Sequence, residues 1–271
     1  MPAKAIDINC DLGESFGAYR LGLDAEVMKY ISSANIACGW HAGDSMVMNN
    51  TVRMANSCGV AVGAHPGYPD LVGFGRRHME CAPEEVESYV TYQVGALNAF
   101  CIRHSINMTH VKPHGALYLR AMNDEKVGAA ICEAIAGLNP NLSLFVIAGP
   151  QGAKLDSIAR SFGLNVCREA FPDRGYNPDG SLVSRMRPDA VLSDPPMVSD
   201  RALMIAKEGR ISAFDGSIVE LQAETLCAHG DNQSAVTIVR EIRARLEEAG
   251  ISIRSGVCGN SRSLTHGALG W

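Results

Sequence analysis

The sequence lacks the features that mark membrane and nucleic-acid-binding proteins. No stretch approaches the roughly 18 consecutive apolar residues of a membrane span. There is no block of Lys and Arg, and the formal net charge is -5, which argues against nucleic acid or an anionic membrane as partner. No secretory signal peptide opens the chain, so we expect a cytoplasmic protein. Small molecules and other proteins remain as partners.

Several short catalytic motifs are also missing. The chain has no GxxxxGK[ST] loop for nucleotide phosphates, no G-x-S-x-G nucleophile turn, and no HExxH or paired CxxC motif for zinc. Segment 148–154, AGPQGAK, resembles a phosphate loop only in being a glycine-containing turn between a strand and a helix. We therefore expect that this chain alone does not couple ATP hydrolysis to a reaction.

The nine cysteines do not suit a disulfide framework, because their number is odd and their spacing is wide. Cys38, Cys167 and Cys227 each lie in an apolar run typical of a buried strand, where a thiol packs as a small hydrophobic side chain. A reducing compartment fits this use of cysteine.

The chain repeats one pattern, a short apolar run followed by a helical stretch. Seven such runs occur: KAIDINCD, SSANIACG, VAVGAHP, THVKPHG, LSLFVIAG, LNVCREAF and AETLCAHGD. Two helices are clear, since 83–104 opens with Pro83 and an acidic turn, and 231–249 carries apolar residues at helical spacing. Apolar strands that alternate with amphipathic helices predict a parallel sheet covered by helices.

We interpret the 271 residues as a single α/β domain, a distorted or seven-stranded TIM-like (β/α) barrel. The segment ISIRS at 251 could instead add an eighth strand, and an open doubly wound sheet is the alternative fold. Segments 173–189 and 210–221 interrupt the pattern and are predicted hairpins, because Pro, Asp and Gly mark their turns. Residues 251–271 are a predicted C-terminal extension.

Polar side chains gather where the predicted strands end. The carboxyl ends of parallel barrel strands meet at one mouth, where active sites lie. Many buried polar groups at equivalent positions indicate a functional site, because each needs a partner. The predicted catalytic residues are Asp11, His41, His65, His114 and His229. The predicted substrate-binding residues are Asn9, Glu14, Asp44, Lys112, Glu169, Asp173, Arg174 and Asp231.

A divalent metal is an option at this mouth. Asp11, His65 and His114 are the candidate ligands, with His41 as an alternative to His65. This mixture of carboxylate and imidazole suits zinc or manganese, but the spacing in sequence leaves both the presence and the identity of an ion open.

Six segments together resemble the lactam-utilisation (LamB/YcsF) family, which supplies the A subunit of bacterial ATP-dependent 5-oxoprolinase. They are DINCDLGE, NIACGWHAGD, GAHPGYPD, VKPHGALY, REAFPDRGY and CAHGD, in this order between residues 5 and 250. Trp40 and the tail after Gly250 depart from the family pattern. The resemblance implies a barrel related to glycoside hydrolases and sugar deacetylases. It also implies ring opening of 5-oxo-L-proline to L-glutamate, with ATP as co-substrate and two partner subunits of the B and C type.

The residues add a chemical rationale to this resemblance. A five-membered lactam is a stable amide, so phosphorylation of its carbonyl oxygen would activate the carbon toward water. That route needs a general base, a cation near the developing charge and a clamp for the substrate carboxylate. Asp11 or His114 could be the base, and Lys112 or Arg174 could hold the carboxylate.

Two other functions remain open at this point. The chain could be a self-sufficient metal-dependent amidase or deacetylase, in which a metal-activated water attacks the carbonyl. It could also be a non-catalytic subunit that binds the lactam and passes it to a partner, and ATP could be bound by the partner subunits.

Overall fold

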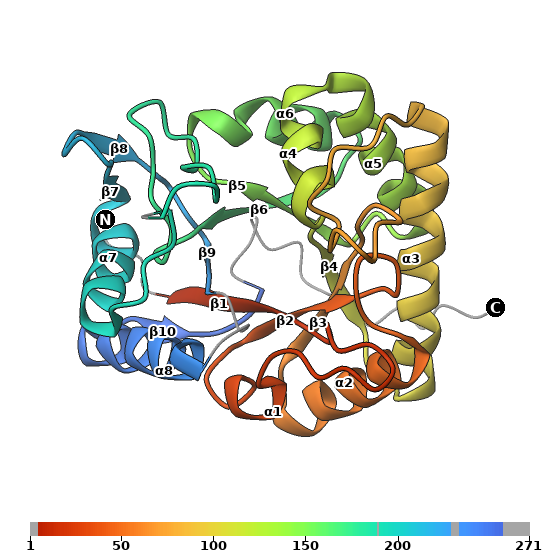
Figure 1. Ribbon diagram of the computed structural model, residues 1–271, viewed down its shortest axis with the longest axis horizontal. Helices are drawn as coiled ribbons and strands as arrows, with labels where there is room; N and C mark the ends of the chain where they lie inside the picture. Colours follow the sequence, from red (N-terminus) through yellow and green to blue (C-terminus); the bar gives the residue numbers. More distant parts are fainter. Residues whose placement is uncertain (1–4, 189, 229–232, 257–271) are drawn as a thin grey trace.

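Seven parallel strands close into a barrel (Figure 1). The structure is a computed structural model, which describes residues 5–188, 190–228 and 233–256. The ring consists, in order, of β1 (Ala5–Leu12), β2 (Ser33–Ala37), β3 (Ala61–His65), β4 (Met108–Val111), β5 (Ser143–Ile147), β6 (Asn165–Ala170) and β9 (Thr225–Cys227). Pairing of β9 with β1 completes the ring. The prediction of a seven-stranded barrel is confirmed, and the open doubly wound sheet is excluded.

An eighth strand lies beside the ring without entering it. β10 (Ser252–Ile253) pairs with Ala5 and Ile6 of β1, whereas β9 pairs with β1 from Asp7 onward. The segment ISIRS therefore extends the edge of β1 at its amino end. Residues 257–271 of the predicted extension lie outside the described residues.

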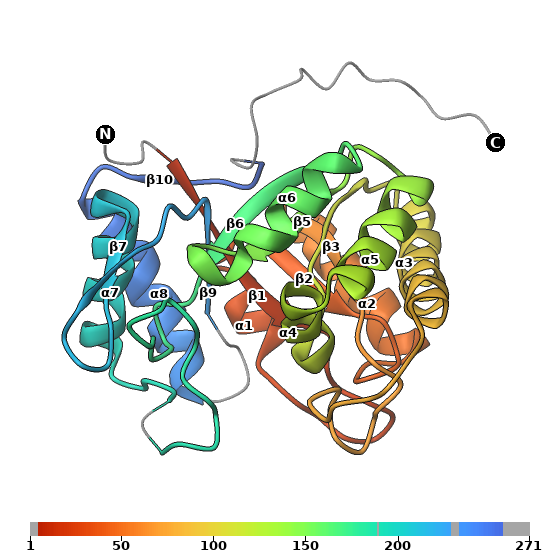
Figure 2. The same ribbon diagram turned by 90° about the horizontal axis from the view of Figure 1, so that it is seen from above.

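Helices cover the outside of the barrel. Figure 2 shows α2, α3 and α5 on one side and α7 and α8 on the other. The helices are α1 (Asp24–Val27), α2 (Ser45–Cys58), α3 (Pro83–Arg103), α4 (Gly115–Asn123), α5 (Glu125–Leu138), α6 (Ala153–Ser161), α7 (Pro195–Glu208) and α8 (Gln233–Glu248), with a 3-10 turn, η1 (Pro150–Gly152). In the described part of the chain, no helix is long and apolar enough to cross a membrane.

Local sequence signals set the helix ends. The Asp44 carboxylate accepts hydrogen bonds from the backbone N–H groups of Met46 and Val47, which caps α2. That helix ends at Gly59 in the left-handed conformation, φ 66°. Pro83 begins α3, and Glu85 accepts from the N–H of Ala82.

The two interruptions lie on the same side of the barrel. β7 (Arg210–Ser212) and β8 (Ile218–Glu220) form an antiparallel hairpin where 210–221 is predicted to be one. Residues 173–188 of the other predicted hairpin form a more irregular loop, in which Tyr176 and Leu182 make an isolated antiparallel bridge.

The barrel interior is more polar than the apolar strand runs suggest. Asp7, which is buried, accepts hydrogen bonds from the hydroxyls of Ser32, Ser33 and Thr225. Above it, Asn9 donates to Thr225 and accepts from Asn35. The side chains of this ladder satisfy one another by hydrogen bonds, and the ladder leads up the barrel axis toward the mouth.

The strand cysteines are buried, as their runs predict. Cys38 and Cys227 are free thiols. Cys167 is equally buried but disulfide-bonded, so the expectation of a free thiol is wrong at that position.

Candidate active site

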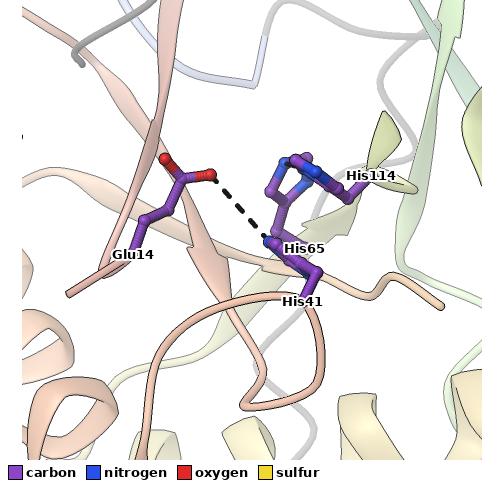
Figure 3. A group of neighbouring side chains, drawn as sticks. All are labelled: Glu14, His41, His65 and His114. Atoms are coloured by element: carbon purple, nitrogen blue, oxygen red, sulfur yellow. Dashed lines mark hydrogen bonds and ion pairs between the residues drawn. The ribbon is translucent and has the colours of Figure 1, made fainter. Parts of the chain in front are cut away.

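The carboxyl ends of the first four strands deliver acidic and imidazole groups to one place. Asp11 lies near the end of β1 and Glu14 just after it, while His65 is the last residue of β3. His41 follows β2, and His114 precedes α4. Figure 3 shows Glu14 opposite the three imidazoles. The predicted residues His229 and Asp231 lie outside the described residues.

His65 and His114 are held in defined orientations by backbone carbonyls. His65 Nδ1 lies 2.6 Å from the carbonyl oxygen of Lys112, and His114 Nε2 lies 2.8 Å from that of Phe74. A carbonyl oxygen only accepts, so both of these ring nitrogens donate. The remaining nitrogens, His65 Nε2 and His114 Nδ1, lie 2.9 Å apart. When the two rings are neutral, each of these two nitrogens carries a lone pair, and the two lone pairs face each other.

His41 completes the imidazole group. Its ring stacks on that of His114, with centroids 3.8 Å apart and planes within 5°. His41 is fully buried, and neither ring nitrogen has a hydrogen-bond partner among the described residues. Its Nε2 lies 3.9 Å from Glu14 Oε1. A buried polar group without a hydrogen bond is costly, so this ring is suited to a ligand.

Burial keeps the imidazoles of His41 and His114 neutral. It lowers the pKa of His41 well below its usual value, and the neighbouring His114 and His65 lower it further. The pKa of His114 is lowered in the same way, by burial first and then by His65. Neutral imidazole is the form that binds metal ions.

Four side chains can offer ligand atoms to one divalent ion. Glu14, His41, His65 and His114 each present an atom, and these atoms lie within 4.8 Å of one another. Ligand atoms bonded to zinc at about 2.0–2.2 Å lie at most about 4.4 Å apart, so a small inward movement of the group would bring all four atoms to one ion. The carboxylate in this group is Glu14, whereas the sequence predicts Asp11. His41 and His65 are both in the group, whereas the sequence gives them as alternatives, and His114 is present as predicted.

Asp11 joins the imidazole group to a buried ion-pair network. Its Oδ2 lies 3.3 Å from His65 Nε2, and its Oδ1 lies 2.8 Å from Lys112 Nζ and accepts from Asn35. Lys112 also lies 3.0 Å from Glu169 Oε1. The network places the Asp11 carboxylate beside the candidate metal ligands, and the contacts with Lys112 and Asn35 hold its orientation.

The Lys112 ammonium is charged although it is buried. Burial alone lowers its pKa, but Asp11, Cys227 and Glu169 outweigh this, and the pKa lies well above its usual value. The Cys227 sulfur is 3.1 Å from the ammonium. With these partners around it, Lys112 is not placed to hold a substrate carboxylate.

The remaining predicted residues have structural partners or lie deeper in the barrel. Arg174 donates to the carbonyl oxygens of Ala190 and Val183, which holds the loop after β6 together. Asp173 is buried after β6. Asp44 caps α2 and also accepts from the N–H of Gly17, while Asn9 lies inside the ladder.

The chain is similar to proteins of one family over nearly its whole length. Residues 6–258 match the LamB/YcsF family. The chain belongs to the LamB/YcsF family. This LamB/YcsF protein is 51% identical to the A subunit of 5-oxoprolinase from Pyrococcus furiosus, over 92% of this chain and 96% of that protein. It is 49% identical to the corresponding 5-oxoprolinase protein from Clostridium beijerinckii, over 92% and 96%.

Solved structures agree with the family and the fold. A lactam utilization protein from Thermus thermophilus superimposes with a TM-score of 0.87 at 45% identity, covering 93% of this chain and 99% of that one. A putative cellobiose-phosphate cleavage protein from Enterococcus faecalis shares the fold alone, with a TM-score of 0.54 at 13% identity, over 93% and 97%.

Sequence reasoning missed several residues around the site of this LamB/YcsF protein. Tyr118 donates to Glu169, and Asn35 donates to Asp11. Phe74 and Gly75, in the loop after β3, cover His41 and His114. The segment GFGRR at 73–77 carries a signal that could have indicated this loop, because two closely spaced glycines permit a tight approach.

Proposed function

We propose that this chain is the A subunit of a 5-oxoprolinase and that it carries out the hydrolytic opening of 5-oxo-L-proline to L-glutamate. The observation that carries the proposal is the convergence of Asp11, Glu14 and three imidazoles at the mouth, in a chain about half identical to proteins of that name. Hydrolysis of an amide needs a proton acceptor and stabilisation of a carbonyl oxygen, and this group of side chains can supply both.

A divalent ion fits the group, and zinc or manganese suits its donors. Glu14, His41, His65 and His114 would hold it, which would satisfy the buried nitrogens of His41. Such an ion would act as a Lewis acid at the carbonyl oxygen and favour deprotonation of water. Asp11, beside His65, would influence the ligands of the ion rather than bind the ion itself.

Asp11 is the general base in this proposal. It accepts a proton from the water that adds to the carbonyl carbon, and Lys112 and Asn35 hold its carboxylate in place. The C–N bond of the lactam then breaks, and the ring nitrogen leaves as an amine that takes up a proton. When the carbonyl oxygen has been phosphorylated by a partner subunit, this step leaves an acyl phosphate, which a second water hydrolyses to L-glutamate and inorganic phosphate.

The proposed reaction also needs ATP and partner subunits. We assign lactam phosphorylation to partner subunits of the B and C type, because the sequence carries no nucleotide phosphate loop. Exposed apolar side chains on the loops at the mouth offer a surface for them, since Tyr19 is 80% exposed and Val72 93%. Seven cysteines in the described part of the chain are free thiols, which supports a cytoplasmic location, and the disulfide-bonded Cys167 is the exception to this pattern.

The test is ATP-dependent glutamate release by the purified chain alone and by the chain with its partner subunits. We expect release only from the complex. Asp11→Asn should lower the rate about a hundredfold to ten-thousandfold while leaving the complex assembled. Asp215→Asn, on the exposed turn between β7 and β8, is the matched control and should keep full activity. ATP-dependent release by the chain alone would refute the division of labour.

A metal-dependent amidase or deacetylase is the second candidate, favoured by the same imidazole group. Opening of the lactam by the metal-loaded chain without ATP would establish it. Full activity of Asp11→Asn and His114→Ala in the complex would instead point to a subunit that binds the lactam without catalysis.

A further inference from the structure

A fourth buried histidine lies inside the barrel, below the imidazole group. His110, in strand β4, is 2% exposed. It precedes Lys112 by two residues, so the two side chains point to the same side of the strand, and His110 lies one layer deeper. Its ring stacks on that of Phe145, with centroids 4.2 Å apart and planes inclined by 11°.

A glycine on the neighbouring strand makes room for this ring. A Cβ at Gly63, in β3, would lie 2.1 Å from Nε2 of His110. Non-bonded atoms normally lie about 3.5–4.0 Å apart, so any larger residue at Gly63 would displace the imidazole. The ring therefore packs closely between the backbone of β3 and the ring of Phe145 and is held in one position.

Both ring nitrogens of His110 have hydrogen-bond partners. Nδ1 lies 2.8 Å from the hydroxyl of Thr109, and Nε2 lies 2.8 Å from Oδ1 of Asn35. An amide oxygen only accepts, so Nε2 carries a proton. Burial first, and then the charge of Lys112, lower the pKa of His110 to about 3. The ring is therefore neutral, and the N–H that it donates to Asn35 is its only one.

The other partners of Asn35 show why its amide has this orientation. Its Nδ2 donates to Oδ1 of Asn9 at 2.7 Å and to Oδ1 of Asp11 at 2.8 Å. The nitrogen of Asn9 donates to Thr225, so the atom that Asn9 turns to Asn35 is its oxygen. A rotated Asn35 would place its oxygen against these two acceptors and its nitrogen against the N–H of His110. The histidine and the two acceptors together select one orientation of the amide.

This orientation reaches the Asp11 carboxylate. Oδ1 of Asp11 accepts from Asn35 and from the Lys112 ammonium. Oδ2 is the oxygen that lies 3.3 Å from Nε2 of His65. The lysine is a rotatable point charge on a flexible stem, whereas a fixed planar amide donates in one direction. The Asn35 contact therefore sets the rotation of the carboxylate relative to the imidazole group.

We propose that His110 is a positioning residue of this site, which holds the Asn35 amide in the orientation that donates to Asp11. The assignment rests on the proposed function for its effect on catalysis, because Asp11 is the general base there. A misplacement of about 1 Å at the reacting groups costs on the order of a hundredfold in rate, so a side chain that acts through another affects turnover.

Turnover of 5-oxo-L-proline by the assembled complex tests the effect on catalysis. His110→Phe keeps a ring against Phe145 but removes the N–H, and it should lower kcat about tenfold to a hundredfold without changing KM or metal content. His110→Gln keeps an amide N–H near the position of Nε2 and should recover most of kcat. In an Asn35→Ala background, His110→Phe should lower kcat no further, because its effect passes through Asn35.

His104→Phe is the matched control. Nε2 of His104 also lies 2.8 Å from an asparagine Oδ1, that of Asn49, but at the carboxyl end of α3, away from the mouth. Its replacement should leave kcat and KM unchanged. Urea unfolding of every variant separates positioning from support of the fold, since kcat should follow the presence of the N–H donor and not the stability.

Crystal structures of the full-length variants give a readout that needs no turnover. The Asp11 carboxylate should turn away from Asn35 in His110→Phe and keep its wild-type position in His110→Gln. If the wild-type complex does not open 5-oxo-L-proline but the structures show this difference, the His110 assignment stands and the lactam function falls. An unmoved Asp11 carboxylate in His110→Phe overturns the assignment whether or not the complex is active. Equal losses of kcat in His110→Phe and His110→Gln overturn it while the function stands.

Discussion

His65 and His114 face each other through ring nitrogens 2.9 Å apart, and each ring donates its other N–H to a backbone carbonyl. The carbonyls belong to Lys112 and Phe74, so the segment after strand β4 and the loop after β3 decide the tautomers. Hydrogen bonds of this kind orient metal-binding histidines. The backbone therefore prepares two nitrogen ligands before any ion is bound.

We predict that the chain binds about one divalent ion per molecule. Dialysis against zinc or manganese followed by elemental analysis should show this, and His65→Ala or His114→Ala should lose the ion because two of the four ligand atoms converge there. His78→Gln is the control, since His78 is exposed and pairs with Glu80. Equal metal content in all variants would contradict the site.

Lys112→Met should be strongly destabilising. The substitution leaves Asp11 and Glu169 without their shared cation, and breaking a buried ion pair costs about 3–5 kcal/mol. Lys154→Met removes an exposed lysine that pairs with Glu125 and should cost at most about 1 kcal/mol. Urea unfolding measures both. Similar losses in the two variants would show that the buried network contributes no more than a surface pair.

Gly75→Ala should displace the imidazoles of His41 and His114 in addition to straining the backbone at residue 75. A Cβ at Gly75 would lie 2.7 Å from the Cβ of His41 and 2.9 Å from Cδ2 of His114. Gly59→Ala is the control, because Gly59 has a similar φ of 66° but open space around it. The strain alone costs about 1–2 kcal/mol. We expect both variants to lose stability and only Gly75→Ala to lose metal affinity, measured by competition with a chelating dye.

The Asp70 carboxyl should give the loop after β3 a stability that depends on acid pH. The hydrogen bond from Arg77 lowers the pKa of Asp70 from its ordinary 3.8 to about 2. A carboxyl with a lowered pKa contributes stability that is fully present above 3.8 and is lost as the pH falls toward 2. The difference in urea midpoint between wild type and Asp70→Asn should therefore narrow from about pH 5 to about pH 3. A constant difference would contradict the role of this charge.

Much of the site follows from strand positions alone. His41, His65 and His114 each come at the end of an apolar run, and a parallel barrel brings the ends of such strands together whatever path the loops take. The strand positions do not determine which of these side chains contact one another. Asp44 ends the same motif as His41, yet its carboxylate caps α2, because the first N–H groups of a helix compete for any nearby acceptor.

The sequence by itself determined the parallel barrel and the mouth, because the strand and helix periods are local and the direction of each strand decides which end carries polar groups. Only the tertiary structure decided how those groups are used. Closure of β9 onto β1 brings Cys227 next to Lys112, and barrel packing surrounds that lysine with Asp11 and Glu169. Left-handed residues in the loop after β3 then place Phe74 and Arg76 beside the imidazoles. Such contacts depend on loop paths and side-chain rotamers between distant segments, which no local pattern records.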